Sequence, residues 1–304
     1  MRAWIPLEQG VPLLGTLPDG VEVDVWDGTD EPPASIGEVE FWVPPFLGNA
    51  QEPGLLAKMA SLRVVQLLSA GADAWVGRLP AGVSLHDARG VHTTSTSEWV
   101  VGAILSVYRS FPEFARAQAE RRWAYRATDE LAGKRILIVG AGDIGEAIRR
   151  RLEPFEVEVV RVARRARPGV HAVAELPALL PAADAVVVVV PLTEATRGMV
   201  DADFLARMKD GALLVNAARG PVADTAALTA ELSSGRLLAA VDVTDPEPLP
   251  ADHPLWTAPG LALLTPHVGG SVYGAFRRGF RLAGEQLRRY AAGEPLVNEV
   301  ADGY

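Results

Sequence analysis

The first hundred residues alternate short apolar runs with turn-forming residues. Five of these runs have the length and composition of β-strands, and the segment 52–62 between two of them has helical spacing. The five runs are RAWIPL (2–7), VEVDVW (21–26), VEFWVP (39–44), RVVQLLSA (63–70) and GVSLHD (82–87). We therefore predict five strands and one helix in this part of the chain.

A long helical stretch follows at 98–126, interrupted at Pro112, and strands and helices alternate regularly after it. The predicted strands are 135–140, 157–162, 185–190, 212–218, 237–243 and 261–267, and the predicted helices between them include 143–153, 201–211 and 224–235. The strands are runs of Val, Ile and Leu without polar alternation, as expected of parallel strands buried on both faces. The pattern predicts a doubly wound α/β sheet, followed by an amphipathic helix at 273–294.

The composition is that of a globular protein and narrows the set of functions. Of 304 residues, 49% are hydrophobic, and 29 basic against 38 acidic side chains give a formal charge of -9. This charge argues against non-specific binding to nucleic acid or anionic membranes. Without cysteine the chain has no disulfide and no thiolate zinc site, and we assign no metal. Because no apolar run reaches membrane-spanning length and no signal peptide is visible, we expect a soluble cytoplasmic protein.

The segment RILIVGAGDIGEAI carries three glycines where an apolar strand passes into a helix. Gly140 permits the tight turn, Gly142 lets the backbone approach a pyrophosphate, and Gly145 allows close packing of helix on strand. The N–H groups of the helix start, at Asp143 and Ile144, would then face the phosphates. We predict a dinucleotide site here rather than a glycine turn without a ligand. The Asp143 side chain would point outward, because a carboxylate repels phosphate.

A cluster of arginines follows the second strand of this fold, in ARRARPG at 163–169. NAD enzymes place an acid about 20 residues after the glycine loop to bind the ribose 2′-hydroxyl. That position is Ala163 here, and the arginines Arg164 and Arg165 follow it directly. A guanidinium matches a 2′-phosphate in charge and in fork geometry. We therefore expect NADP(H) to be preferred, with Arg164 as the main contact, Arg165 as a secondary one, Arg167 within reach, and NAD(H) as the alternative cofactor.

Three polar side chains come after later strands: Arg219 in LLVNAARGPVAD, Glu247 in AAVDVTDPEPLP and His267 in LALLTPHVGG. The carboxyl ends of parallel strands share the sheet edge at which such folds bind ligands. Arg219 would bind the carboxylate and carbonyl oxygen of a 2-keto acid through its fork of donors. His267 would protonate the carbonyl oxygen, with Glu247 holding the imidazole and favouring its charged form. Each residue alone is consistent with a structural role, so the prediction depends on their occurring together with the glycine loop.

The chain closely resembles the D-isomer-specific 2-hydroxyacid dehydrogenases in five segments: GAGDIG, VVVPLTEATRGMV, LVNAARGPVAD, AVDVTDPEPLP and LLTPHVGG. The resemblance covers almost the whole chain. It implies a homodimeric enzyme with two doubly wound parallel-sheet domains, a Rossmann cofactor domain inserted into a flavodoxin-like substrate domain. The expected boundaries are 1–97 for the first part of the substrate domain, 98–275 for the cofactor domain with its dimerisation arm, and 276–304 for the returning C-terminal helix.

The resemblance also implies roles for individual residues. Arg219, Glu247 and His267 match the catalytic residues of the family, and Arg219 and His267 would also bind substrate. Asp242 matches the residue that binds the nicotinamide carboxamide. Further cofactor contacts are implied at Pro191, Thr196, Ala217 and Gly269.

Two other segments acquire roles only through the resemblance. In LLSAGAD, the backbone N–H groups of Ala70 and Gly71 would meet the substrate carboxylate. The arm 98–123 matches the region through which the family dimerises. Selectivity for the substrate side chain would come from the N-terminal loops, where the candidates are equally consistent with core residues: Trp42, Pro44, Phe46 and Trp75.

The predicted function is that of an NADPH-preferring reductase that transfers hydride to C2 of a small 2-keto acid. The absence of a basic cluster in the N-terminal loops favours glyoxylate, hydroxypyruvate or a modest apolar keto acid over a phosphorylated one. Two alternatives stay open: a dinucleotide-sensing corepressor, which shares the fold and the three residues, and phosphite oxidation, which relatives perform with the same trio. We assign no role to the other histidines, His86, His92, His171 and His253.

Overall fold

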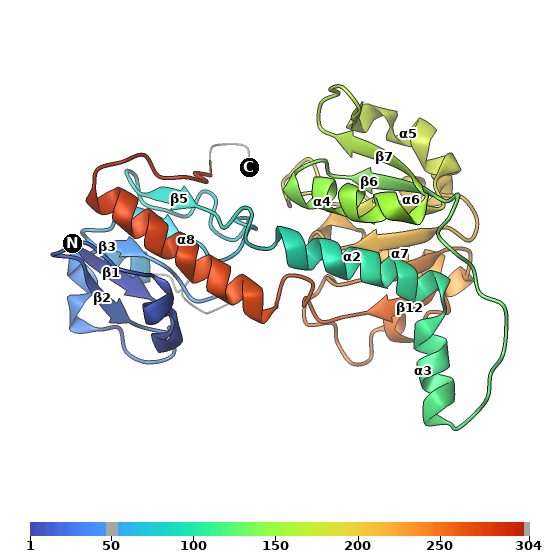
Figure 1. Cartoon of the computed structure of the whole chain (residues 1–304), viewed down its shortest axis with the longest axis horizontal. Helices are drawn as coiled ribbons and strands as arrows, with labels where there is room; N and C mark the ends of the chain where they lie inside the picture. The colour runs from blue at the N-terminus through green and yellow to red at the C-terminus, as the bar shows by residue number, and fades with distance from the viewer. Residues whose placement is uncertain (47–53, 301–304) are drawn as a thin grey trace. The chain divides into compact units, whose positions relative to one another are not determined.

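The computed structural model describes residues 1–46 and 54–300, and the chain forms two compact units (Figure 1). Unit 1 comprises Met1–His92 and Ser271–Tyr304, and unit 2 comprises Thr93–Gly270. Each unit contains a sheet of its own, and every strand pairing in the two sheets is parallel. The prediction of two parallel-sheet α/β domains is confirmed.

Unit 1 is built on a five-stranded sheet with the order β2-β1-β3-β4-β5, which is the flavodoxin-like order. Its strands are β1 (Arg2–Ile5), β2 (Glu22–Val25), β3 (Val39–Trp42), β4 (Val64–Gln66) and β5 (Ser84–His86). Each strand lies within one of the five apolar runs of the sequence. Because the strands are parallel, the segments that follow β3, β4 and β5 emerge at one edge of this sheet.

Successive side chains of these strands pack on opposite faces of the sheet. Trp4 belongs to a core cluster that includes residues of α1 (Leu55–Lys58), whereas its neighbour Ala3 packs with Phe280 of α8 (Tyr273–Ala291). This period of two residues is inherent in a pleated strand. The apolar stripe of α8 therefore covers one face of the unit 1 sheet (Figure 1).

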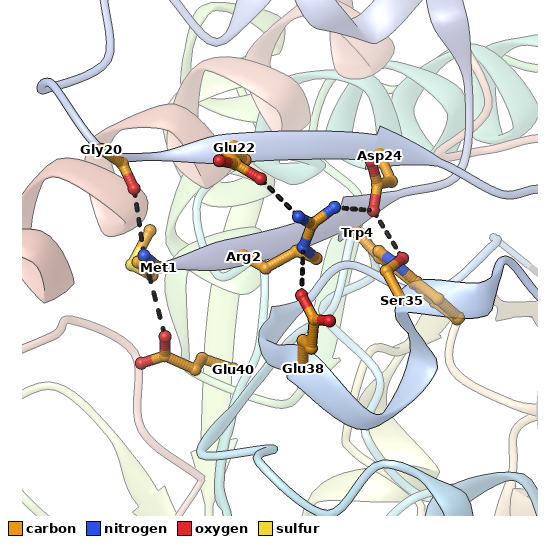
Figure 2. Close-up of polar contacts among 9 residues, drawn as sticks. All are labelled: Met1, Arg2, Trp4, Gly20, Glu22, Asp24, Ser35, Glu38 and Glu40. Carbon is orange, nitrogen blue, oxygen red and sulfur yellow. Dashed lines mark hydrogen bonds and ion pairs between the residues drawn. The ribbon is translucent and has the colours of Figure 1, made fainter.

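One edge of the unit 1 sheet is held by a charged cluster around Arg2 (Figure 2). The guanidinium donates from Nη1 to Asp24 at 3.0 Å, contacts Glu38 through Nε at 3.1 Å, and pairs with Glu22 through Nη2. Ser35 donates to the same Asp24 carboxylate at 2.6 Å. Burial alone would raise the pKa of Asp24, but the hydrogen bonds from Ser35 and Arg2 outweigh it and lower that pKa. The cluster joins β1, β2 and the turn before β3.

Unit 2 contains a seven-stranded sheet with the order β12-β11-β10-β9-β6-β7-β8. From β8 to β11 this is the Rossmann order, and β12 adds one more parallel strand. The strands are β6 (Arg135–Val139), β7 (Glu158–Ala163), β8 (His171–Ala172), β9 (Ala185–Val188), β10 (Leu213–Asn216), β11 (Leu238–Val241) and β12 (Leu261–Leu264). The order reverses between β6 and β9, the point beside which folds of this kind bind dinucleotides.

Helices cover both faces of the unit 2 sheet. Ile136 and Ile138 of β6 pack in a cluster with residues of α2 and α4, whereas Leu137 and Val139 pack with residues of α5, α6 and α7. The helices are α2 (Thr93–Tyr108), α3 (Phe111–Ala119), α4 (Asp143–Leu152), α5 (Leu176–Leu179), α6 (Ala202–Arg207) and α7 (Thr225–Ser234). Burial on both faces explains the continuous apolar runs of these strands.

The structure corrects the predicted bounds of the helical arm. The first helix begins at Thr93 rather than at residue 98, and no helix continues beyond Ala119 into residues 122–130. The start of α2 is polar although Ser95, Thr96 and Ser97 are buried, and Ser97 donates to the Thr93 carbonyl at 2.7 Å. Because this turn is stabilised by side-chain hydrogen bonds, it lacks the apolar spacing by which helices are recognised. Figure 1 shows α3 projecting from the end of α2.

Other differences concern short elements. The helix predicted at 52–62 has only one described turn, α1, and the helix predicted at 201–211 ends at Arg207. The strand β8 and the helix α5 were not predicted, since two and four residues are too few to establish a period. Among residues 1–46 and 54–300, we find no helix long and apolar enough to cross a membrane.

Candidate active site

The predicted catalytic residues lie after three adjacent strands of unit 2. Arg219 follows β10, Glu247 follows β11 and His267 follows β12, and these strands are neighbours in the sheet. Parallel pairing of β10 with β11 and of β11 with β12 places the three loops at the same edge. The carboxyl edge of an open parallel sheet is where α/β proteins bind their ligands.

His267 and Glu247 form a direct pair across two loops. His267 Nδ1 lies 2.7 Å from Glu247 Oε1, and the two side chains are 26% and 40% exposed. A carboxylate only accepts hydrogen bonds, so it fixes the proton on Nδ1 and leaves Nε2 to face a reacting group. The backbone of His267 is left-handed, with φ 54°. Such a conformation is strained for a residue other than glycine and is concentrated at functional sites.

Asp242 organises the loop that carries His267. Its buried carboxylate accepts hydrogen bonds from the Thr265 hydroxyl at 2.5 Å and from the N–H groups of Val268 at 2.9 Å and Gly269 at 2.7 Å. Its backbone carbonyl accepts the His267 N–H at 2.7 Å. These four bonds fix the backbone on both sides of His267. The sequence indicated a role for Asp242 only toward the cofactor, and Thr265 was missed because a lone hydroxyl after a strand carries no signal.

The Arg219 loop is fixed in two ways. The buried side chain of Asn216 accepts from Ala218 N at 3.1 Å and donates to the Arg219 carbonyl at 3.4 Å. At the next position, a Cβ on Gly220 would lie 1.8 Å from the Thr244 carbonyl oxygen. Only glycine allows this approach, which brings the Arg219 loop against the segment that leads to Glu247. Sequence reasoning missed the role of Asn216.

The glycine loop has the shape that a pyrophosphate requires. Gly140 has φ 119°, and a Cβ there would lie 2.5 Å from the Val189 carbonyl oxygen. A Cβ on Gly145 would lie 1.9 Å from the Gly140 carbonyl oxygen, so helix and strand pack as closely as predicted. A Cβ on Gly142 would meet nothing within 4 Å. The loop therefore leaves open space at the one glycine that packing does not explain, which fits a phosphate group.

Other predicted cofactor residues surround this loop or lie at the same edge. Asp143 is exposed at the first position of α4 and Ile144 follows it, half-buried. Thr196 donates to the Pro191 carbonyl at 2.6 Å in the segment after β9. Ala217 follows β10 directly and is also half-buried.

The arginine cluster follows β7 as the sequence indicated, and the strand ends at Ala163. Arg164 and Arg165 are exposed. Arg167 is exposed as well, and its Nη2 donates to the carbonyl of Ala141 in the glycine loop at 2.6 Å. Arg167 therefore contacts the glycine loop directly, a contact that counting residues along the sequence could not show.

In unit 1, the loop with Ala70 and Gly71 follows β4. Both residues are half-buried, and the Ser69 hydroxyl donates to the Gly71 carbonyl at 2.8 Å. Of the proposed selectivity residues, Trp42 and Trp75 belong to the core and meet edge to face at 5.5 Å. Pro44 is buried too, so Phe46, 47% exposed, is the one of these four whose side chain is open to solvent.

Comparison with known proteins matches residues 101–269 to a family described as D-isomer specific 2-hydroxyacid dehydrogenase, NAD binding domain. A human glyoxylate reductase/hydroxypyruvate reductase is 32% identical over 304 residues, covering 92% of this chain and 90% of the relative. A D-isomer specific 2-hydroxyacid dehydrogenase from Xanthobacter autotrophicus Py2, solved with NADPH and MES, has a TM-score of 0.84 at 32% identity and covers 99% and 97% of the two chains. An NADPH-dependent glyoxylate/hydroxypyruvate reductase from Sinorhizobium meliloti, solved with NADP and sulfate, has a TM-score of 0.84 at 27% identity, covering 98% of each chain.

Proposed function

Because the chain belongs to the D-isomer-specific 2-hydroxyacid dehydrogenase family, we propose that it reduces glyoxylate, hydroxypyruvate or a similarly small 2-keto acid, with NADPH as the preferred cofactor. Members of this family are NAD(P)-dependent oxidoreductases that act on small hydroxy and keto acids. The observation that carries the proposal is the 2.7 Å contact between His267 and Glu247 at the edge where Arg219 emerges. An imidazole oriented in this way is suited to protonate a carbonyl oxygen.

Each residue of the site has its own role in the proposed reaction. His267 donates a proton from Nε2 to the carbonyl oxygen, while Glu247 accepts from Nδ1 and orients the imidazole. Arg219 binds the carboxylate and the carbonyl oxygen, and the N–H groups of Ala70 and Gly71 bind the carboxylate. When bound, a nicotinamide would supply the hydride.

The same proposal assigns residues of unit 2 to the binding of the dinucleotide. The pyrophosphate would lie against Gly142 and the N–H groups that begin α4, in a loop whose tight turn and helix packing depend on Gly140 and Gly145. Asp242 and Gly269 bind on the nicotinamide side. The remaining contacts come from Pro191, Thr196 and Ala217.

The preference for NADPH rests on the end of β7. An acid at Ala163 would repel a 2′-phosphate, and in its absence the charged residues that directly follow the strand are Arg164 and Arg165. Arg164 is the principal contact and Arg165 a secondary one. Arg167, which lies beside the glycine loop, adds positive charge on the same side. The relatives from Xanthobacter and Sinorhizobium, whose structures contain NADPH and NADP, support this assignment.

The protein is proposed to act as a homodimer that pairs through the α2–α3 arm. Apolar side chains on this arm and the segment after it stand exposed: Phe111 is 55% exposed, Trp123 94% and Tyr125 89%. Large aromatic side chains in solvent are typical of an interaction surface. Trp123→Ser should weaken self-association in analytical ultracentrifugation, and an unchanged dissociation constant would move the interface elsewhere.

The proposed function is tested by steady-state oxidation of NADPH with a panel of 2-keto acids. We expect turnover with glyoxylate or hydroxypyruvate, and a loss of more than about tenfold in kcat/KM for Arg219→Lys, because an ammonium cannot copy the guanidinium fork. NADPH binding without turnover of any keto acid would favour the dinucleotide sensor. Reduction of NADP driven by phosphite would favour phosphite oxidation.

A further inference from the structure

The loop that carries Ala70 and Gly71 is anchored at its start by a histidine side chain. His92 Nε2 lies 2.8 Å from the carbonyl oxygen of Leu68, two residues before Ala70. A carbonyl only accepts, so Nε2 carries the proton of this bond. The Phe46 ring lies against the same imidazole, with ring centroids 6.1 Å apart. His92 therefore contacts both the substrate loop and the one solvent-exposed aromatic residue among the selectivity candidates.

A second anchor comes from α8. Arg278 Nε donates to the carbonyl of Val91 at 2.8 Å, the residue directly before His92. The next residue of α8, Gly279, packs closely on the loop itself, because a Cβ at this position would lie 3.2 Å from Leu68 Cδ2. The Nη2 of Arg278 is buried and has no hydrogen-bond partner among the described residues. A buried guanidinium nitrogen without a partner is energetically unfavourable, so Nη2 itself does not stabilise the fold.

The loop between Leu68 and Gly71 is otherwise fixed through its own carbonyl groups. The Ser69 carbonyl accepts from Ala88 N at 2.8 Å, and the Gly71 carbonyl accepts from the Ser69 hydroxyl at 2.8 Å. A peptide plane whose carbonyl is bound also has its N–H direction fixed. The carbonyl of Ser69 shares its plane with the N–H of Ala70. The direction of that donor is therefore set by bonds inside unit 1, and the His92 contact holds the preceding plane.

We propose that His92 and Arg278 are positioning residues for the substrate carboxylate: they hold the loop so that the N–H groups of Ala70 and Gly71 point at the bound anion. This inference rests on the proposed function, because it assumes that the loop binds a carboxylate. Neither side chain takes part in proton or hydride transfer. Their loss should weaken binding of the keto acid and leave binding of the dinucleotide unaffected.

Each anchor can be removed and then restored by a conservative substitution. His92→Leu and Arg278→Leu delete the donors, whereas His92→Gln and Arg278→Gln place an amide Nε2 close to the position of the lost nitrogen. For the leucine variants we expect the KM for the keto acid to rise about tenfold, with kcat and the KM for NADPH within about threefold. The glutamine variants should recover most of the lost affinity. His171→Leu, in unit 2, is the matched control and should behave as wild type.

Two results would overturn the proposal. One is a folded His92→Leu variant whose KM for the keto acid stays within about twofold of wild type. The other is a leucine variant in which the melting temperature and both KM values change together and glutamine restores none of them, because that pattern describes a purely structural role.

A readout that needs no turnover separates this proposal from the proposed function. Amide hydrogen exchange in the peptide that contains residues 67–72 should be faster in His92→Leu than in wild type and in His171→Leu. If the wild-type protein reduces no keto acid, the proposed function fails, and faster exchange would still support the anchoring. Unchanged exchange in this peptide would contradict the anchoring whether or not the enzyme is active.

Discussion

Gly142→Ala is expected to separate dinucleotide binding from folding. Gly142 is the N-cap of α4, with φ -83° and ψ -163°, values that alanine also adopts. An added Cβ would meet nothing within 4 Å. Alanine is a poorer N-cap than glycine by roughly 0.5–1 kcal/mol, and the stiffer unfolded chain offsets about the same amount. The free energy of unfolding should therefore stay within about 1 kcal/mol of wild type.

The effect on the dinucleotide complex should be much larger. The methyl group would occupy the space through which the pyrophosphate approaches the backbone N–H groups. Loss of one charge-assisted hydrogen bond is worth roughly 1.5–3 kcal/mol, which corresponds to a Kd for NADPH about 10–150-fold higher. Urea unfolding followed by circular dichroism gives the stability, and titration of nicotinamide fluorescence gives the Kd.

Gly145→Ala is the matched control, because its Cβ would lie 1.9 Å from the Gly140 carbonyl oxygen. Relieving this clash requires a backbone shift, so stability should fall by about 1–3 kcal/mol even without ligand. A Gly142→Ala variant that binds NADPH within about twofold of wild type would refute the assignment of the pyrophosphate to this loop.

Three further substitutions test other parts of the structure. His267→Gln should lower kcat by about 10²–10⁴-fold in steady-state assays while the Kd for NADPH is unchanged, because only the proton donor is lost. Glu247→Gln keeps an acceptor for Nδ1 but removes the charge, and with this carboxylate 40% exposed we expect a loss in kcat of about tenfold, measured in the same assay. Burial favours a raised pKa of Asp184, but hydrogen bonds from Arg135 N and Lys209 Nζ outweigh it and lower that pKa. Asp184→Asn should therefore destabilise by about 1 kcal/mol at pH 7 in urea unfolding, and the difference should vanish as the pH falls below about 3.9 through the folded pKa.

Much of the fold could be predicted because its strands coincide with apolar runs, which are continuous in unit 2, where helices cover both faces of the sheet. All five strands of unit 1 and six of the seven in unit 2 lie where such runs occur. The exceptions are elements whose sequences show no apolar periodicity. The first turn of α2 is polar and is stabilised by side-chain hydrogen bonds, and β8 has two residues.

In the candidate site, too, some features could be predicted from the sequence and others could not. Residues at strand ends could be identified because topology brings such ends to one edge, and the His267–Glu247 contact joins two of them. Contacts that depend on the path of a loop could not be identified. The four bonds of Asp242, the approach of Arg167 to the glycine loop and the anchoring of Leu68 by His92 all depend on backbone conformation. No spacing along the chain encodes them.

Hydride transfer from NADPH to C2 of a 2-keto acid can be followed by isotope transfer. NADPH carrying deuterium at the reactive position of the nicotinamide would be incubated with wild-type protein and glyoxylate or hydroxypyruvate, and the hydroxy acid analysed by mass spectrometry. We expect a hydroxy acid heavier by the transferred deuterium, formed at least about tenfold faster with NADPH than with NADH at limiting cofactor, and strongly reduced in His267→Gln. A hydroxy acid without the label, or no hydroxy acid from either substrate, would contradict this mechanism.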